Sequence, residues 1–138
     1  MKYLLDTNIL SETRRSQPNR DVQEWIAAAK PEQLCLSVIT IGEIGRGVTR
    51  LRERGDLRQA AAIQNWLDNI IGAFSTRIVP INVAVALRWA TQSTAQLLPT
   101  ADGLIAASAT VHDLTLVTRN VKDFQRSGVR MLNPFTDS

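Results

Sequence analysis

Four acidic residues, Asp6, Glu43, Asp102 and Asp123, are the side chains of this sequence best suited to chemistry. They are scattered along the chain, at positions that a parallel α/β fold would bring together. Carboxylate oxygens are the ligands that hard divalent cations such as Mg²⁺ prefer. If the four side chains share one pocket, the sequence predicts a metal-dependent phosphodiesterase.

Three of these acids, Asp6, Asp102 and Asp123, also have purely structural interpretations. Asp6 could cap the helix that follows it, a role worth about 0.5–2 kcal/mol. Asp102 lies two residues after a predicted helix cap at Thr100 and could complement the helix dipole for about 0.3–1 kcal/mol. Asn120 and Asp123 have the spacing of a capping box at a helix start. The sequence leaves these alternatives open.

Glu43 lies in a segment with helical periodicity, on the side opposite its apolar residues. The simplest interpretation is a solvated glutamate that pairs weakly with Arg46. The segment also contains Gly42, Gly45 and Gly47, and each costs about 0.8–1.0 kcal/mol in a helix interior relative to alanine. We therefore expect another part of the backbone to approach this helix closely. Its apolar face comprises Ile41, Ile44, Val48 and Leu51.

The composition excludes several other chemistries. The chain has one histidine, His112, and one cysteine, Cys35, which rules out an ordinary zinc site, a histidine acid–base pair and an intramolecular disulfide. No glycine-rich loop ends in Gly-Lys-Ser/Thr, which argues against nucleoside triphosphate chemistry. Cys35 lies in an apolar run and is expected to be a buried structural thiol. His112 is expected to end a helix.

Charge and terminal composition bear on partners and compartment. The net charge is +3, and arginine provides 13 of the 16 basic residues, which suits phosphate contact because guanidinium groups bind phosphate bidentately. A coding bias toward arginine explains the same composition. The N-terminus lacks the apolar core of a secretory signal, and no apolar span reaches about 18 residues. We expect a cytoplasmic protein without membrane contact.

Short apolar runs alternate with amphipathic segments, as in proteins with a parallel sheet. This pattern predicts an α/β fold: a three-layer α/β/α sandwich with a parallel five-stranded sheet, formed by a single domain over residues 1–138. Ser11–Pro18 and the tail after Asn133 are expected to be the least regular segments. The predicted strands are Lys2–Leu5, Leu34–Ser37, Arg77–Pro80, Leu114–Thr118 and, as a candidate fifth, Val129–Leu132. The first predicted helix starts at an Asn19 cap. Further helices are predicted over Ile41–Leu51, Leu57–Phe74 and Val83–Leu97 and from Thr100 to near His112, with a break at Gly55-Asp56 between the second and third helices.

Ligands of such sheets bind beyond the carboxyl ends of the strands. Asp6 directly follows the first predicted strand, and Thr118, Arg119 and Asn120 follow the fourth. Asp102 lies in the first turn of a helix, which is at the same edge whenever a strand precedes it. The predicted fold therefore places candidate ligands from distant parts of the chain at one edge.

Several segments resemble PIN-domain proteins, specifically the ribonuclease toxins of the VapC and FitB-like type from bacterial toxin–antitoxin pairs. The resemblance covers essentially the whole chain. It implies the PIN fold and an endoribonuclease that depends on Mg²⁺ or Mn²⁺. The segments that carry it are Leu4–Glu12, Leu36–Gly47, Ala101–Ala107, Leu116–Asn120 and Asn133–Phe135.

By this resemblance, Asp6, Glu43 and Asp102 occupy the acidic positions of the family's metal site. FitB-like relatives carry aspartate where this chain has Asn120, which offers a carbonyl oxygen but no charge. Asp123, three residues later, could supply the missing carboxylate through a one-turn helix. Whether the site holds one metal or two stays open.

The resemblance also suggests a role for each group. Asp6 and Asp102 would be the principal ligands, and Glu43 would complete the metal's shell or position the attacking water. Thr118 matches a strand-end hydroxyl that could bind a metal-bound water. The cation would neutralise phosphate charge and lower the pKa of that water. Because crowded acids repel, we expect at least one of them to have a raised pKa without metal, and metal affinity to fall with acidity.

The implied partners are an RNA substrate and a cognate antitoxin whose tail crosses the acidic pocket with a basic side chain. The family commonly forms homodimers, and higher assemblies with the antitoxin are possible. A PIN fold that has lost catalysis and acts as an interaction module is the alternative, because Asn120 lacks the family's charge. A phosphoacceptor receiver domain fits poorly, since Asp6 is followed by Thr7 and Thr118 by Arg119 instead of the acid and lysine that it needs. The target RNA, the antitoxin and the oligomer size are not evident from the sequence.

Overall fold

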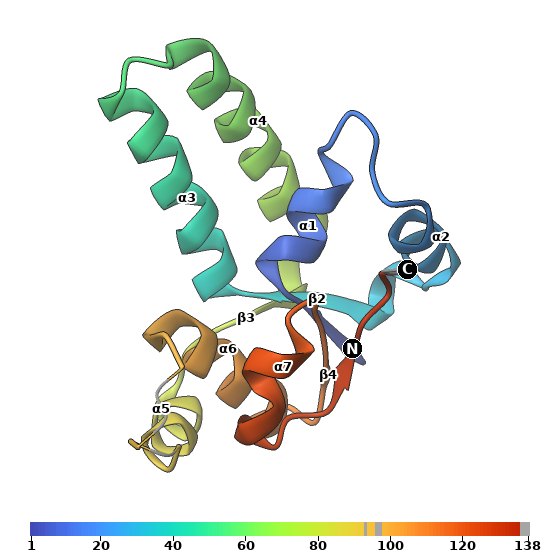
Figure 1. Ribbon diagram of the computed structural model, residues 1–138, viewed down its shortest axis with the longest axis vertical. Coiled ribbons are helices and arrows are strands. Elements are labelled where there is room, and N and C mark those ends of the chain that lie inside the picture. Colours follow the sequence, from blue (N-terminus) through green and yellow to red (C-terminus); the bar gives the residue numbers. More distant parts are fainter. Residues whose placement is uncertain (93, 96–97, 136–138) are drawn as a thin grey trace.

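The computed structural model describes residues 1–92, 94–95 and 98–135, and its centre is a parallel β-sheet (Figure 1). Within these residues the sheet has five strands in the order β3-β2-β1-β4-β5, and every neighbouring pair is parallel. The first strand of the chain therefore lies in the middle of the sheet. All five strands predicted from the apolar runs are confirmed. Their bounds are β1 (Tyr3–Leu5), β2 (Leu34–Ser37), β3 (Ile78–Val79), β4 (Thr115–Val117) and β5 (Met131–Leu132).

Helices connect the strands and cover both faces of the sheet, as parallel connections require (Figure 1). In Figure 1, α3 and α4 run side by side away from the sheet, and α5, α6 and α7 lie on its other side. The α-helices are α1 (Thr7–Thr13), α2 (Arg20–Ala28), α3 (Val38–Glu53), α4 (Leu57–Phe74), α5 (Val83–Ala90), α6 (Thr100–Val111) and α7 (Val121–Phe124). Short 3-10 helices are η1 (Pro31–Gln33), η2 (Ser75–Arg77) and η3 (Gln125–Ser127).

Two hydrophobic cores, one on each face, hold the helices against the sheet. Side chains alternate along β1, so Leu4 belongs to one core and Leu5 to the other. This arrangement confirms the predicted three-layer α/β/α sandwich. The core around Leu4 includes Ile105, Ala106 and Ala109 of α6 and Phe124 of α7. The core around Leu5 includes Ile9 of α1, Val22 of α2, Ile44 of α3 and Leu67 of α4.

Polar residues mark the helix starts. The Oδ1 of Asn19 accepts hydrogen bonds from the backbone N–H groups of Asp21 and Val22 at 3.0 and 3.1 Å, which confirms the predicted cap of α2. The break before α4 is also confirmed, because Gly55 has a φ of +81° and Asp56 caps the helix. A left-handed conformation of this kind favours glycine, since it lacks a Cβ.

Three expectations about helices need correction or fall outside the structure. Ser11–Thr13 is helical, not irregular, because it ends α1, which Asp6 caps and which buries Ile9 and Leu10. The helix was missed because it is too short to show an apolar period. Thr100 is the first helical residue and not the cap, because the extended Pro99 is already the last non-helical residue. The predicted helix through Leu97 ends at Ala90, and Leu97 itself lies outside the described residues.

The predicted close approach at the α3 glycines is wrong. A Cβ built on Gly42, Gly45 or Gly47 would meet no atom within 4 Å beyond the helix's own neighbouring backbone. The close approach is instead at Gly103 of α6, where a Cβ would lie 2.7 Å from the Oε1 of Gln92 and 3.0 Å from Trp89. Helix propensity alone therefore identified the wrong glycines.

None of the helices in the described part of the chain is long and apolar enough to cross a membrane.

Candidate active site

Asp6 and Thr118 lie side by side at the carboxyl ends of two neighbouring strands. Leu5 and Val117 are register partners in β1 and β4, so the residues that follow them meet. Thr118 Oγ1 donates a hydrogen bond to Asp6 Oδ2 at 2.8 Å, and the backbone N–H of Thr7 donates to Asp6 Oδ1 at 2.8 Å. Asp6 is 4% exposed and Thr118 is fully buried. Asp6 thus caps α1, as one interpretation predicted, and also faces the predicted site.

Asn8 contributes to this arrangement, although its role was missed from the sequence. Its Nδ2 lies 3.3 Å from Asp6 Oδ2 and 3.4 Å from Thr118 Oγ1. Its Oδ1 accepts a long hydrogen bond of 3.4 Å from the backbone N–H of Arg119. Asn8 therefore joins the first turn of α1 to the loop after β4. Its position directly after Asp6-Thr7 was the available signal.

Glu43 is held by a hydroxyl and is not the solvated residue of the simplest interpretation. Thr7 Oγ1 donates to Glu43 Oε1 at 2.7 Å and lies 3.4 Å from the Oγ1 of the fully buried Thr40. The helix that carries Glu43 starts directly after β2, where Ser37 accepts a hydrogen bond from the backbone N–H of Ile39. The end of β2 and the start of α1 therefore jointly fix this carboxylate.

Asp102 is half-buried in the first turn of α6, and its pKa is raised from 3.8 to about 6. Burial is the largest cause, followed by repulsion from Asp6, Glu43 and Asp123 in that order. Burial also raises the pKa of Asp6, although hydrogen bonds from Thr118 and the Thr7 backbone oppose the change. The expected rise in pKa among the crowded acids is confirmed, but desolvation contributes more than repulsion.

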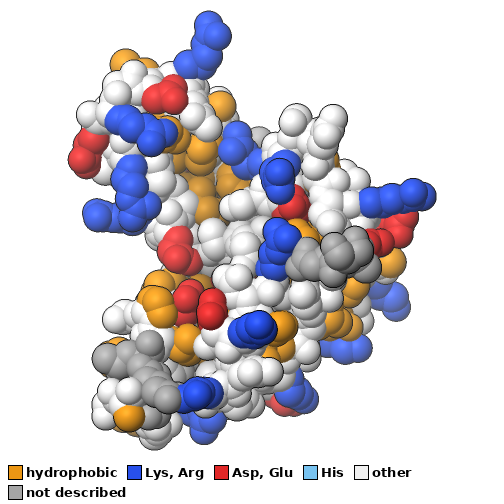
Figure 2. Space-filling view, in the orientation of Figure 1, with side chains coloured by type: hydrophobic (Ala, Val, Ile, Leu, Met, Phe, Trp, Pro, Cys, Tyr) orange, Lys and Arg blue, Asp and Glu red, His pale blue; other side chains and the backbone are white. Residues whose placement is uncertain are grey.

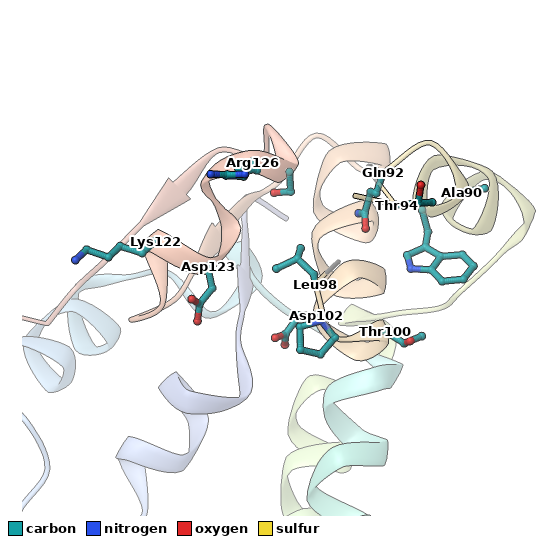
Figure 3. A pocket seen from close by; sticks show the side chains of 12 residues that line it. Ala90, Gln92, Thr94, Leu98, Thr100, Asp102, Lys122, Asp123 and Arg126 are labelled. Carbon is teal, nitrogen blue, oxygen red and sulfur yellow. The ribbon is translucent and has the colours of Figure 1, made fainter. Parts of the chain in front are cut away.

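Asn120 and Asp123 occupy different positions around the short helix α7. Asn120 precedes α7 with an exposed side chain that makes no capping hydrogen bond, so the predicted capping box is wrong. Its backbone N–H donates instead to Thr118 Oγ1 at 3.0 Å. Asp123 lies one turn later and projects into the cavity that Asp102 enters from the opposite wall (Figure 3). Its charge acts on Asp102, whereas the neutral Asn120 adds none.

The carboxylates of this site suit a hard cation such as Mg²⁺ or Mn²⁺ better than a closed structural metal site. Among the residues that the structure describes, no three His, Cys, Asp or Glu side chains are close enough together to form a metal-binding group. Magnesium is usually bound by one or two carboxylates, with waters and substrate phosphates as the other ligands. A pair of carboxylates such as Asp6 and Asp102 fits that mode, while the tetrahedral cage of structural zinc does not.

The two residues expected to have structural roles have them. Cys35 is fully buried in β2, its Sγ lies 3.1 Å from the carbonyl oxygen of Tyr3, and burial raises its pKa to about 11. His112 is the C-cap of α6, which confirms its place at a helix end. Neither residue belongs to the acidic site.

The protein is thus a parallel α/β sandwich with carboxylates at one edge of its sheet, and similarity to known proteins identifies its family. The PIN domain model matches residues 3–128, and the chain therefore belongs to the PIN-domain family. It is 34% identical to toxin FitB of Neisseria gonorrhoeae over 97% of this chain and 99% of FitB. It is 30% identical to VapC ribonuclease Y4jK of Sinorhizobium fredii over 96% of each chain. The crystal structure of FitAcB from Neisseria gonorrhoeae superimposes with a TM-score of 0.85 and 34% identity, covering 96% of this chain and 97% of that one.

Proposed function

We propose that this protein is a Mg²⁺- or Mn²⁺-dependent endoribonuclease that acts in the cytoplasm as the toxin of a toxin–antitoxin pair. The observation that supports it most directly is the buried Asp6, held by Thr118 within the electrostatic reach of Asp102. The similarity to a toxin and to a ribonuclease over nearly the full chain supports the same activity.

Asp6 and Asp102 would hold the cation. Asp123 would supply the further carboxylate that Asn120, a neutral residue, does not. The cation would supply positive charge to the scissile phosphate and acidify the attacking water. Glu43 has one oxygen bonded to Thr7, and its other oxygen would orient that water toward the phosphorus. Thr118 favours the ionised form of Asp6 by donating to it, although burial raises the pKa of this carboxyl more than the bond lowers it.

An antitoxin would bind the groove between α1, α3 and α4, which has a volume of about 350 Å³. Its lining is largely apolar, with Ile44, Leu51 and Ile63, and Glu43 lies at the same groove. An inhibitor with an apolar face could fill this groove while a basic side chain reaches the acids. The groove therefore supports the partner that the family resemblance implies.

A homodimer would form through α5. Val83 and Leu87 are 74% and 64% exposed and lie one helical turn apart on its outer face. Large exposed apolar side chains gathered on one helix are typical of an interface. A larger assembly would add the antitoxin to this dimer.

Incubation of purified protein with cellular RNA tests the activity. We expect cleavage with Mg²⁺ or Mn²⁺, no cleavage with chelator, and a loss of roughly a hundredfold in Asp6→Asn and Asp102→Asn, because each removes a ligand charge. Asp113→Asn is the matched control, since this exposed carboxylate pairs with Arg130 away from the site. Circular dichroism would confirm that the variants are folded.

The alternative function is a PIN fold that binds partners without catalysis, and the neutral Asn120 is the observation that favours it. Absence of metal-dependent cleavage across a broad RNA pool, in a folded protein that binds the product of the neighbouring gene, would support that alternative. Cleavage that survives chelation or both substitutions would contradict the proposed mechanism.

A further inference from the structure

A second groove opens beside Asp102 and Asp123, away from the apolar groove between α1, α3 and α4. It has a volume of about 730 Å³ and includes Asp102 and Asp123 in its lining. Binding sites for ligands usually measure about 300–1,000 Å³. Trp89 and Gln92 line it on the α5 and α6 side, and Lys122 and Arg126 line it along α7 and η3. Apart from Asp102 and Asp123, the proposed function assigns no role to the residues that line this groove.

Close contacts next to Asp102 define the α5 and α6 wall. Gln92 Nε2 donates a hydrogen bond to the carbonyl oxygen of Gly103 at 2.9 Å. Trp89 packs so closely that a Cβ on Gly103 would lie 3.0 Å from its indole ring. The Trp89 residue is still 40% exposed. An aromatic surface is thus fixed beside the candidate catalytic carboxylate.

The opposite wall carries two exposed cations on either side of Asp123. Arg126 lies along the rim of the groove, and Lys122 extends from α7 beyond Asp123 (Figure 3). In the space-filling view, acidic side chains gather at a hollow in the surface and basic side chains continue along the same face (Figure 2). Lysine and arginine bind phosphate oxygens through charged hydrogen bonds.

We propose that this groove binds single-stranded RNA next to the phosphodiester that is cut. Lys122 and Arg126 contact backbone phosphates, and Trp89 contacts one unstacked base. The inference rests on the proposed ribonuclease function and adds the residues that contact the RNA beside the acids. Cations combined with an exposed aromatic ring are the chemistry of single-strand binding, because a paired duplex keeps its base faces covered. The other groove also has a cation and an aromatic ring, but Arg14 there lies over the ring of Trp66, 5.1 Å from its centroid, so that this ring face is already covered.

Salt-dependent binding tests the phosphate contacts. The probe is a fluorescent, unstructured 12-nucleotide RNA, bound in Mg²⁺ to protein carrying Asp6→Asn so that it is not cut. Adding Lys122→Ala and Arg126→Ala should weaken binding about tenfold or more. The slope of log Kd against log salt should become shallower by about 1.4, or about 0.7 for each lost contact. The matched control is Arg20→Ala with Arg130→Ala, two exposed arginines paired elsewhere on the surface.

Cleavage by protein with native Asp6 gives the second readout. Lys122→Ala with Arg126→Ala should raise KM strongly and change kcat little, because the cations bind RNA without touching the reacting atoms. Equal behaviour of this variant and the arginine control, in both KM and salt slope, would overturn the proposal. Normal RNA binding with lost binding to the neighbouring gene product would also overturn it, since the groove would then dock a protein.

The two proposals can fail separately. Binding that depends on Lys122 and Arg126 without any cleavage by the native protein supports the groove and contradicts the nuclease. Normal metal-dependent cleavage that ignores these cations supports the nuclease and contradicts the groove.

Trp89 has its own test, in which a single abasic position is moved along the RNA. One position should weaken binding to the native groove several-fold, because base stacking on an aromatic side chain is lost there. Trp89→Leu should abolish this positional effect, and Trp89→Phe should keep it. A uniform response along the RNA in protein with native Trp89 would show that no base contacts the indole.

Discussion

The hydroxyl of Thr118 donates to the carboxylate of Asp6 across 2.8 Å and joins two residues that are 112 positions apart in the sequence. This bond connects the ends of β1 and β4 at the centre of the sheet. It also lowers the pKa of a carboxyl group that burial would otherwise raise further. The bond therefore couples the folding of the sheet to the charge of its principal acid.

Thr118→Val should remove this bond while keeping the shape of the side chain. We expect a higher pKa for Asp6, weaker Mg²⁺ binding and a stability loss of about 1–3 kcal/mol, because a buried charged acceptor loses its donor. Carboxyl titration by NMR and chemical denaturation measure these effects. Thr118→Ser keeps the hydroxyl and should change both values much less. An unchanged Asp6 pKa in Thr118→Val would show that the bond has no electrostatic effect.

The raised pKa of Asp102 predicts a fall in the stability of the metal-free protein as the pH rises from about 4 to about 6. Between the ordinary value of 3.8 and the folded value of about 6, the folded state binds more protons than the unfolded state. The free energy of unfolding therefore decreases with pH over this window. Asp102→Asn should make this dependence shallower in denaturation curves measured with chelator. If the free energy of unfolding changed equally with pH in the two proteins across this window, the raised pKa would not belong to Asp102.

Metal binding should show the opposite pH dependence. A proton on Asp102 competes with the cation, so Mg²⁺ affinity should rise as the pH increases through about 6. Calorimetric titration at pH 5, 6, 7 and 8 would measure the change, with Asp113→Asn as the control. Affinity that is constant across this range would exclude Asp102 as a ligand.

The neighbours of Asp102 should differ in their influence. Asp6→Asn should lower its pKa most, Glu43→Gln less and Asp123→Asn least, following the order of their repulsion. NMR titration of the Asp102 carboxyl carbon distinguishes these cases. If Asp123→Asn had the largest effect, Asp123 would be the dominant partner of Asp102, and the ligand assignment would need to change.

Two glycine substitutions should change the stability of the protein in opposite directions. Gly103→Ala inserts a methyl group 2.7 Å from Gln92 Oε1, so we expect a loss of about 1–3 kcal/mol through overpacking. Gly72→Ala lies in α4 with no atom within 4 Å of the new methyl group, and should stabilise the protein by about 0.5–1 kcal/mol. Urea denaturation measures both. Equal stability of the two variants would mean that Gln92 and Trp89 move away from Gly103 easily.

The sequence predicted the sheet and the position of Asp6 because apolar runs and the strand-end rule depend on local patterns. Thr7 and Asn8 were missed because their roles depend on the direction of α1, a helix too short to have a readable apolar period. Thr40 precedes Glu43 by three residues and could have been placed near it on the helix surface. Its contact with Thr7, however, exists only after β1 and β2 have paired.

The roles of Asn120 and Asp123 were also beyond the sequence. Their spacing suggested a capping box, but the capping hydrogen bond depends on the backbone angles of one residue, which residue type does not determine. The α3 glycines illustrate the converse error. Their low helix propensity is an intrinsic property of the backbone and carries no information about neighbours in space.

The central position of β1 has a consequence for the synthesis of this protein. The strand that carries Asp6 leaves the ribosome first, but its partner β4 is made only after residue 114. A nascent or prematurely terminated chain thus contains Asp6, Glu43 and Asp102 without the Thr118 hydroxyl that completes the pocket. If the protein is the proposed nuclease, its activity therefore appears only when translation of the sheet is complete.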